Sequence, residues 1–217
     1  MTGTGTEVGK TVVAAAIART ATERGERVAV FKPAVSGLDD LAPGREPDHE
    51  LLRRAAGSSQ SDDEIAPYRY GPPVSPHLGA ELAGERIDPP RLLEAAASAG
   101  AGADLLVCEG VGGLMVPLTP GYLVRDFARD LGFPLVVAAP PGLGTINHTL
   151  LTIDAARAVS LEVAVVVLTP WPDDPGDLER SNREAIERLS GVVMMTLPRL
   201  SLGDPSRWPQ LSITPPG

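Results

Sequence analysis

The chain has 217 residues, 43% of them hydrophobic, and a formal net charge of −9, so it can bury one core and we expect a single domain over residues 1–217. The acidic balance argues against non-specific binding to nucleic acid or acidic membranes, because both require basic patches. The single cysteine, Cys108, excludes an internal disulfide and a cysteine-rich metal site, while the lack of a signal peptide or a membrane-length apolar run favours the cytoplasm.

Residues 3–11 have the composition of a phosphate-binding loop. They read Gly-Thr-Gly-Thr-Glu-Val-Gly-Lys-Thr, and glycines let several backbone N–H groups point at one anion. Lys10 can reach the β- and γ-phosphates of a nucleotide, and the hydroxyl group of Thr11 can ligate Mg²⁺. The apolar run that follows predicts a helix over residues 10–24, whose N-terminus would point at the same phosphates. A glycine-rich turn before an ordinary helix is less favoured, because Gly-Lys-Thr opening a helix is a tighter constraint than scattered glycines.

This loop departs from the usual pattern in two ways. The usual spacing would place the first glycine at Thr4, but glycines stand at positions 3 and 5, so the loop is one residue longer counted from Gly3. Such a loop also normally follows a buried strand, and only Met1 and Thr2 precede it here. We therefore expect the first strand to be missing or truncated: either the chain starts late or the sheet lacks its usual first strand.

Strands and helices are predicted to alternate along the rest of the chain. A strand over residues 27–31 leads into a loop over residues 32–37, at the edge where open α/β sheets place ligands. Asp48 stands at the N-cap position of a helix. Residues 57–77, which contain four prolines, are expected to form an ordered loop. The remaining predictions are helices near 78–83, 89–99, 122–131, 146–159 and 177–189, and strands over 104–109, 134–139, 162–168 and 192–197.

A carboxylate follows one of these apolar strands. Glu109 ends the strand over residues 104–109, and Gly110, Val111 and Gly112 come directly after it. A strand-end acid beside a phosphate-binding loop usually holds Mg²⁺, directly or through water, and the alternative is a plain turn residue. Strands alternating with helices predict an α/β fold with a doubly wound, mainly parallel sheet and helices on both faces, like that of P-loop nucleoside triphosphatases.

Taken together, five segments resemble those of dethiobiotin synthetases. The resemblance spans about residues 3–200, and the long loop that starts with Gly-Thr is itself the variant of that family. The missing first strand remains a departure. The segments are residues 3–11, Lys-Pro-Ala-Val-Ser-Gly from Lys32, Ser-Pro-His from Ser75, Glu-Gly-Val-Gly-Gly from Glu109 and Gly-Thr-Ile-Asn-His from Gly144.

The resemblance implies an ATP- and Mg²⁺-dependent cyclo-ligase of biotin biosynthesis. Members of the family close a ureido ring on 7,8-diaminononanoate (7,8-diaminopelargonate) with CO₂ and MgATP, and they release ADP and phosphate. One amine is carbamylated, the carbamate takes the γ-phosphoryl group, and the second amine attacks and expels phosphate. Such phosphoryl transfer needs positioning and positive charge more than covalent help from the protein.

The resemblance also implies roles for individual residues. Lys10 would lie on the transferring phosphate, and Lys32 would offset charge on the carbamate and on the migrating phosphate. Thr11, Asp48 and Glu109 would hold Mg²⁺ as hard oxygen ligands. The other nucleotide contacts would come from Glu7, Val8, Gly9, Val12, Gly110, Val111, Gly112, Thr169, Pro170, Pro198, Arg199 and Leu200.

The substrate site is expected to be shared between two subunits. Thr6 and Ser36 would hydrogen-bond the diamine or its carbamate. A helix N-terminus suits the carboxylate of the substrate, and the segment that opens this helix would consist of Leu143, Gly144, Thr145, Ile146 and Asn147. In the family this segment comes from the neighbouring subunit, so a homodimer is implied.

Recognition of the nucleotide base is expected to be weak. In many members of the family an asparagine ends the strand predicted here over residues 162–168, and its amide recognises adenine. Thr169 takes that position, and Pro170 has no N–H group to add. Loss of a paired contact costs about 1–3 kcal/mol of discrimination, so we expect relaxed nucleotide choice.

Other interpretations remain for these residues. Asp48 alone would be a helix cap, Lys32 alone a surface lysine, and the three histidines do not form a ligand-spaced set. A deviant P-loop ATPase acting as a nucleotide-dependent dimer switch is the alternative function, but it carries an extra lysine where Thr4 and Gly5 stand. Cobyrinate amidation would need a glutaminase domain with a catalytic cysteine. A plain nucleotide-binding module would leave Lys32 and Glu109 without a task.

Overall fold

The computed structural model describes residues 1–213. Its helices are α1 (Lys10–Glu23), α2 (Asp48–Ala56), α3 (Asp62–Ile65), α4 (Pro76–Leu82), α5 (Pro89–Ala99), α6 (Val124–Leu131), α7 (Thr145–Arg157) and α8 (Asp177–Ser190), with 3₁₀ turns η1 (Leu38–Asp40) and η2 (Pro205–Arg207). Its strands are β1 (Thr2–Gly3), β2 (Val28–Phe31), β3 (Ala34–Val35), β4 (Tyr68–Arg69), β5 (Leu105–Cys108), β6 (Pro117–Thr119), β7 (Tyr122–Leu123), β8 (Leu135–Ala139), β9 (Val163–Trp171) and β10 (Val193–Pro198).

Two groups of parallel strands form the centre of the molecule. One group has the order β1-β8-β9-β10, and the other pairs β2 with β5. Met1 connects them: its amino group donates to the carbonyl oxygen of Cys108 at 2.8 Å, and its own carbonyl accepts from the backbone N–H of Gly110 at 2.9 Å. Two small pairs lie outside, parallel β3-β4 and antiparallel β6-β7. The predicted α/β fold with a mainly parallel sheet is confirmed.

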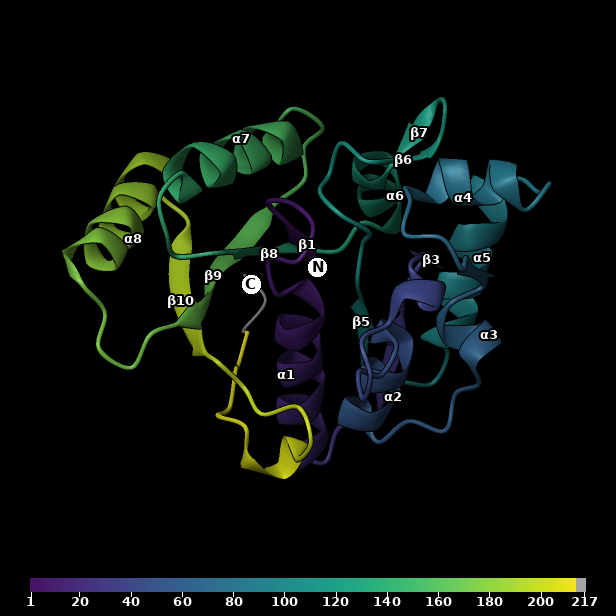
Figure 1. Cartoon of the computed structure of the whole chain (residues 1–217), viewed down its shortest axis with the longest axis horizontal. Coiled ribbons are helices and arrows are strands. Elements are labelled where there is room, and N and C mark those ends of the chain that lie inside the picture. Colours follow the sequence, from purple (N-terminus) through teal and green to yellow (C-terminus); the bar gives the residue numbers. More distant parts are fainter. Residues whose placement is uncertain (214–217) are drawn as a thin grey trace.

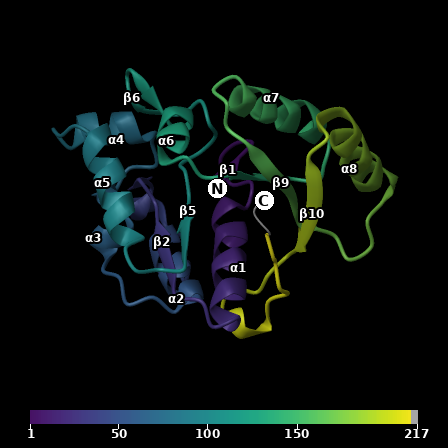
Figure 2. The same ribbon diagram turned by 180° about the vertical axis from the view of Figure 1, so that it is seen from behind.

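Helices cover both faces of these strands. Along β9, Val165 and Val167 pack with α1 and α2, while Val166 and Leu168 pack with residues of α5, α6, α7 and α8. This alternation is the period of two that a strand buried on both faces must show. In both ribbon views α1 lies between the β8–β10 group and the β2–β5 group (Figures 1 and 2). The loop before α1 is therefore placed at the middle of the sheet.

The first strand is present and short. β1 pairs only Thr2 with Val137 and Gly3 with Ala138 of β8. Beyond Met1, an apolar groove of about 280 Å³ continues between β5 and β8. A longer first strand would pair there with both neighbours. The groove is lined by Met1, Ile17, Asp104, Leu105, Leu106, Val107, Cys108, Phe133, Pro134, Val136, Ala164 and Ile213.

The structure corrects four details of the predicted elements. The segment 57–77 contains the short helix α3, which a capping box between Ser61 and Glu64 starts, and the strand β4, which is two residues long. Asp48 is not an N-cap: Pro47 holds that position, and Asp48 is the first helical residue. The ninth strand runs to Trp171 instead of ending at residue 168. The hairpin β6-β7 precedes α6, where only a helix was predicted.

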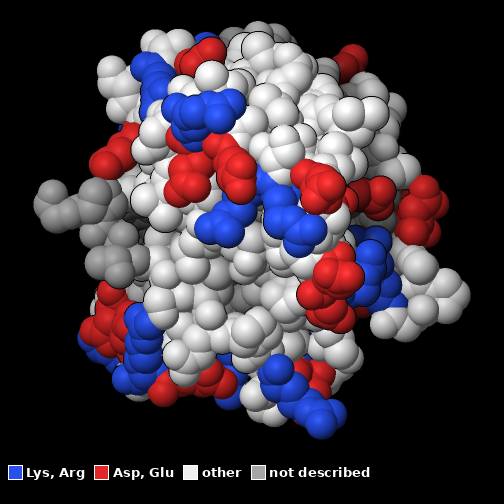
Figure 3. Space-filling view, turned by 90° about the vertical axis from the view of Figure 1, so that its left-hand side faces the viewer, with Lys and Arg blue, Asp and Glu red and all other residues white. Residues whose placement is uncertain are grey.

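The outer surface carries both signs of charge. On the side where α8 and β10 lie, Lys and Arg side chains are interspersed with Asp and Glu side chains over the described residues (Figure 3). Within residues 1–213, no helix is both long enough and apolar enough to cross a membrane. We therefore expect the cationic side chains that bind ligands at the carboxyl ends of the central strands.

Candidate active site

The phosphate-binding loop connects β1 to α1. Gly9 is the N-cap of α1 and has φ 88°, and Glu7 is also left-handed with φ 59°. A Cβ atom on Gly9 would lie 2.6 Å from Cγ2 of Thr169, so only glycine fits at this position. The ammonium group of Lys10 donates to the carbonyl oxygen of Gly5 at 2.7 Å, and burial lowers the pKa of Lys10. The lysine thus lies against the loop that precedes it, at the N-terminus of α1.

The ammonium group of Lys32 lies between two carboxylates. Lys32 follows β2 and Glu109 follows β5, and because these parallel strands are neighbours their carboxyl ends meet. Nζ of Lys32 lies 2.6 Å from Oδ2 of Asp48 and 2.7 Å from Oε1 of Glu109. The hydroxyl group of Thr11 donates to the same oxygen of Glu109 at 2.9 Å. Lys32 is 16 positions from Asp48 and 77 positions from Glu109 in the sequence, and the fold brings the three side chains into one cluster.

Burial and mutual attraction shift the pKa values in this cluster. Burial alone would lower the pKa of Lys32, but the two carboxylates outweigh it and hold that pKa above its ordinary value. Burial alone would raise the pKa of Asp48, but Lys32 holds it below its ordinary value. Glu109 is 0% exposed, and burial raises its pKa despite Lys32. Lys10 also interacts with both carboxylates, so two ammonium groups face two carboxylates, and Glu109 is the buried group whose charged form is disfavoured.

The cluster fits a hard divalent cation. Oε2 of Glu109 is buried and has no hydrogen-bond partner among residues 1–213. A buried polar atom without a partner is costly, and a ligand is one way to satisfy it. The hydroxyl group of Thr11 and the carboxylates of Asp48 and Glu109 are all oxygen donors, the class that Mg²⁺ prefers.

Two cavities meet at the phosphate-binding loop. The larger, about 570 Å³, lies between this loop and the loops that follow β2 and β5. Of the predicted residues it is lined by Thr6, Glu7, Lys10, Thr11, Lys32, Ser36, Asp48, Glu109, Val111 and Gly112. The second, about 380 Å³, leads toward the ends of β9 and β10 and is lined by Glu7, Gly9, Lys10, Thr11, Val12, Thr169, Pro170, Pro198, Arg199 and Leu200. An elongated ligand with phosphates at the loop would extend along the second cavity.

Some predicted residues lie outside both cavities. The side chain of Val8 packs near the core below α1, and Gly110 lies against Val124, whose Cγ1 would be 2.9 Å from an added Cβ. Residues 143–147 form the start of α7 and line neither cavity. Within that segment Thr145 is buried, whereas Leu143 is 93% exposed.

Sequence reasoning missed several residues of the site. Arg45 lines both cavities, and its guanidinium lies 4.0 Å from the carboxylate of Glu7. It belongs to an irregular loop with no motif, so no local signal could have found it. Ser75 and Pro76 also line the larger cavity, and the hydroxyl group of Ser75 lies 2.9 Å from Nδ1 of His77. The Ser-Pro-His segment was noted for its resemblance, but no role followed from it.

Known proteins match this chain over most of its length. A family model described as an AAA domain matches residues 1–206. Three relatives carry the name ATP-dependent dethiobiotin synthetase BioD. The one from Bacillus subtilis subsp. natto is 35% identical over 202 residues, which are 93% of this chain and 87% of the relative. The one from Bacillus cereus (strain B4264) is 41% identical (91% and 81%), and the one from Rhodococcus erythropolis is 39% identical (91% and 86%).

Solved structures of lower identity share the fold. The cell division ATPase MinD of Pyrococcus furiosus has a TM-score of 0.54 and 18% identity, covering 91% of this chain and 81% of its own. The cell division protein FtsY of Thermotoga maritima has a TM-score of 0.51 and 15% identity, covering 94% and 63%. At such identities the likeness concerns the fold alone, so it does not favour a nucleotide-dependent dimer switch.

Proposed function

The chain belongs to the ATP-dependent dethiobiotin synthetase family, and we propose that its site closes the ureido ring of dethiobiotin from 7,8-diaminononanoate (7,8-diaminopelargonate), CO₂ and ATP. The enzyme is an ATP-dependent cyclo-ligase of biotin biosynthesis. One observation carries the assignment of chemistry to residues. Lys32 lies between Asp48 and Glu109 in a cavity that Lys10 and Thr11 also line.

The reaction consists of three bond-forming steps. An amine of the substrate adds to CO₂ and loses a proton, which gives a carbamate. A carbamate oxygen attacks the γ-phosphorus of ATP, and the bond to ADP breaks. The second amine then attacks the carbonyl carbon, the bond to phosphate breaks, and a further proton is released as the ring closes. Two of the three nucleophiles are amines of the substrate, and the third is the carbamate oxygen, which comes from CO₂. The protein therefore has to position the reactants and stabilise charge.

Lys10 and Lys32 provide the positive charge for these steps. Lys10 is 7% exposed and Lys32 is 3% exposed, so both act in a site from which water is largely excluded. A fixed positive charge in such a site stabilises developing negative charge more than it would in water. Lys10, at the N-terminus of α1, would bind the transferring phosphate together with the backbone N–H groups of the loop. Lys32 would face the carbamate in the larger cavity.

Thr11, Asp48 and Glu109 would hold Mg²⁺. When bound, the ion would offset the negative charge of the phosphates of ATP. The orphaned oxygen of Glu109 and the set of oxygen donors support this assignment. Because Thr11 belongs to the phosphate-binding loop, the three residues would hold the ion beside this loop.

The substrate would lie in the larger cavity, with a second subunit completing the site. Thr6 and Ser36 line this cavity and offer hydroxyl groups to the diamine or its carbamate. The first turn of α7 would hold the carboxylate of the substrate bound to the neighbouring subunit. Its position outside both cavities of its own chain and the 93% exposure of Leu143 support a role toward a partner.

Phosphate release tests the proposed function. Purified protein is given MgATP, the diamine and bicarbonate, and each is omitted in turn. We expect phosphate release only when all three are present, and dethiobiotin formed in equal amount. Phosphate release from MgATP alone at the same rate would instead favour a nucleotide-dependent switch.

A further inference from the structure

The short helix α3 is attached to the strand that carries Lys32. The side chain of Gln60 accepts from the backbone N–H of Val30 at 2.9 Å and donates to its carbonyl oxygen at 3.1 Å. The backbone N–H of Lys32 donates to the carbonyl oxygen of Ile65, the last residue of α3, at 2.7 Å. The segment from Gln60 to Ile65 therefore follows the outer edge of β2 to the point where Lys32 begins.

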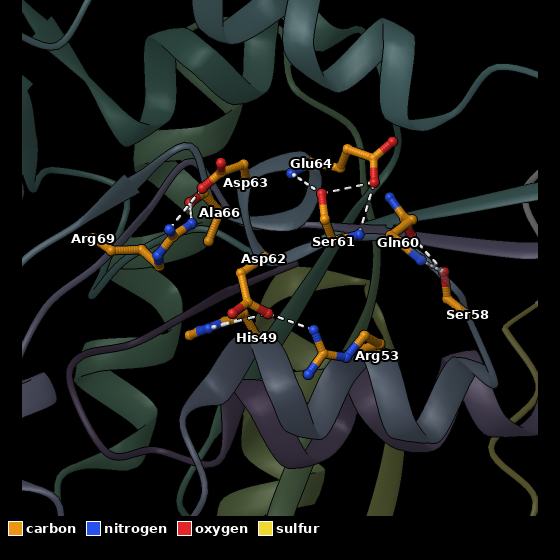
Figure 4. Close-up of polar contacts among 10 residues, drawn as sticks. All are labelled: His49, Arg53, Ser58, Gln60, Ser61, Asp62, Asp63, Glu64, Ala66 and Arg69. Atoms are coloured by element: carbon orange, nitrogen blue, oxygen red, sulfur yellow. Dashed lines mark hydrogen bonds and ion pairs between the residues drawn. The ribbon is translucent and has the colours of Figure 1, made fainter.

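Asp62 links the same short helix to α2. Its carboxylate pairs with the guanidinium of Arg53, and Oδ1 lies 3.8 Å from Nε2 of His49 (Figure 4). His49 and Arg53 are four residues apart on α2, so both lie on the face of that helix that is turned to α3. Asp48 is the residue immediately before His49 and the first residue of α2. One carboxylate thus connects the strand that bears Lys32 with the helix that bears Asp48.

The first turn of α2 has no side-chain cap. Pro47 is its N-cap, and no described side chain donates or accepts at this cap. The His49 side chain is only 4% exposed, whereas those of Arg53 and Asp62 are 33% and 42% exposed. The ion pair between Asp62 and Arg53 joins α3 to the second turn of α2, one turn beyond the uncapped first turn, while His49 of the first turn packs beside Asp62.

A metal ion is a poor occupant of this cluster. The ligand atoms of His49, Glu50 and Asp62 lie within 4.8 Å of one another. The guanidinium of Arg53, however, already binds Asp62 and would repel a second cation at that carboxylate. The unpartnered Nδ1 of His49 belongs to the opposite side of the ring from Nε2, which is the nitrogen that faces Asp62.

We propose that Asp62 is a positioning residue for Asp48: through Arg53 and His49 it holds α2 against the carboxyl end of β2, so that Asp48, the first residue of α2, stays within reach of Lys32 and of the metal. The proposal rests on the proposed function, in which Asp48 is a metal ligand. Groups that hydrogen-bond directly to a metal ligand change metal affinity by about 10- to 100-fold when they are replaced, and since Asp62 acts on Asp48 through α2 we expect the lower end of that range.

Binding of Mn²⁺ in the presence of ATP, without diamine, tests this role. Mn²⁺ stands for Mg²⁺ because its binding can be followed by electron paramagnetic resonance. We expect Asp62→Asn to weaken Mn²⁺ binding about tenfold. Asp63→Asn is the matched control, since Asp63 is the next residue of α3 but pairs with Arg69 of β4. This control is expected to bind Mn²⁺ like the unchanged protein.

A double-mutant cycle separates positioning from general loss of structure. Asp48→Asn should weaken Mn²⁺ binding, and adding Asp62→Asn to it should weaken binding no further, because the residue to be positioned is already lost. An equal additional loss in the double variant would overturn the positioning role. Unchanged affinity in Asp62→Asn beside a weakened Asp48→Asn would overturn it as well. Unchanged affinity in Asp48→Asn would overturn both the metal assignment and the positioning role.

Arg53→Met provides a second route if Asp62→Asn does not fold. It removes the same ion pair from the α2 side and leaves the capping box of α3 in place. We expect the same loss of Mn²⁺ affinity, of about tenfold. Normal Mn²⁺ affinity in folded Arg53→Met would show that the ion pair with Asp62 has no bearing on Asp48.

Discussion

At the scale of single residues, Lys32 has two tasks. It compensates the buried Glu109 in the ligand-free protein, and it is proposed to stabilise the carbamate and the migrating phosphate. Lys32→Ala should lower kcat by at least about 100-fold, because each 1.4 kcal/mol lost from the transition state costs about tenfold. Lys10→Ala should do the same. Steady-state kinetics with circular dichroism as the control for folding provide the measurement. Near-normal turnover of folded Lys32→Ala would remove this residue from the mechanism.

The buried carboxylate of Glu109 is expected to lower the stability of the ligand-free protein, although the same carboxylate is proposed to bind Mg²⁺. Burial raises the pKa of Glu109, so its charged form is disfavoured in the folded protein, and Glu109→Gln, which keeps an acceptor for Thr11 and Lys32, should raise the unfolding free energy of the ligand-free protein near pH 7. The same variant should need a higher Mg²⁺ concentration, since an amide is a weaker ligand for a hard cation. Thermal unfolding without ligand and a Mg²⁺ titration of activity measure the two effects. An unchanged Mg²⁺ requirement would make Glu109 a plain turn residue.

The stability gain of Glu109→Gln should depend on pH. The pKa of Glu109 is raised above its ordinary value of 4.5, which means that the folded state binds the proton more tightly than the unfolded chain. The unchanged protein therefore loses stability from this group as the pH rises from 4.5 through the raised pKa. The difference in Tm between variant and unchanged protein should grow over that range. A difference that shrinks as the pH rises would contradict the charge assignment.

Thr169 bears on the choice of nucleotide. Its side chain is 3% exposed, and its methyl group lies 2.6 Å from where a Cβ atom on Gly9 would be, so it packs against the phosphate-binding loop. We expect other triphosphates to support turnover within about tenfold of ATP, because the phosphates and Mg²⁺ would supply most of the binding. Values of kcat/KM for ATP, GTP and CTP at one Mg²⁺ concentration test this. A preference for ATP of about a hundredfold or more would mean that other groups read the base.

At the scale of elements, the groove between β5 and β8 offers room for a longer first strand. The groove is apolar, and Met1 is one of the residues that line it. Burial lowers the pKa of the Met1 amino group. Placing about five apolar residues before Met1 would fill the groove and move the charged terminus away from Cys108 and Glu109. We expect Tm to rise by about 2 °C or more.

A Gly/Ser extension of equal length is the control for this strand. It lengthens the chain and displaces the terminal charge, but it has no side chains to fill the apolar groove. A rise in Tm with both extensions would assign the effect to the terminal charge alone. No rise with the apolar extension would show that the groove does not accept a strand.

The elements themselves were largely predictable from local pattern. Apolar runs of four to six residues located the central strands, and Gly-Lys-Thr located the start of α1 at Lys10. The errors arose where the local signal is weak. Helix α3 has four residues, too few for a helical period, and it lies among prolines. Pro47 before Asp48 was overlooked as a cap, because aspartate is the more frequent residue at that position.

At the scale of the whole molecule, the proposed homodimer can be tested by mixing inactive variants. Lys32→Ala impairs the site of its own subunit, whereas Asn147→Ala is proposed to impair the site of the partner. A mixed dimer then contains one intact site, so random mixing of the two variants should restore about a quarter of normal activity. As the control, each variant is carried through the same mixing procedure alone. No recovery on mixing would place residues 143–147 in the site of their own subunit, and normal activity of Asn147→Ala would remove Asn147 from substrate binding.

The sequence by itself determined the class of chemistry. Glycine freedom, a lysine and a hydroxyl group within residues 3–11 define a phosphate-binding loop because all the parts are neighbours in the chain. The tertiary structure alone decided which distant residues meet. Lys32, Asp48 and Glu109 converge because β2 and β5 pair in parallel and α2 packs beside them. No local signal in the sequence predicts the ion pair of Asp62 with Arg53, or the position of Arg45 beside both cavities. Such contacts depend on how elements far apart in sequence pack together.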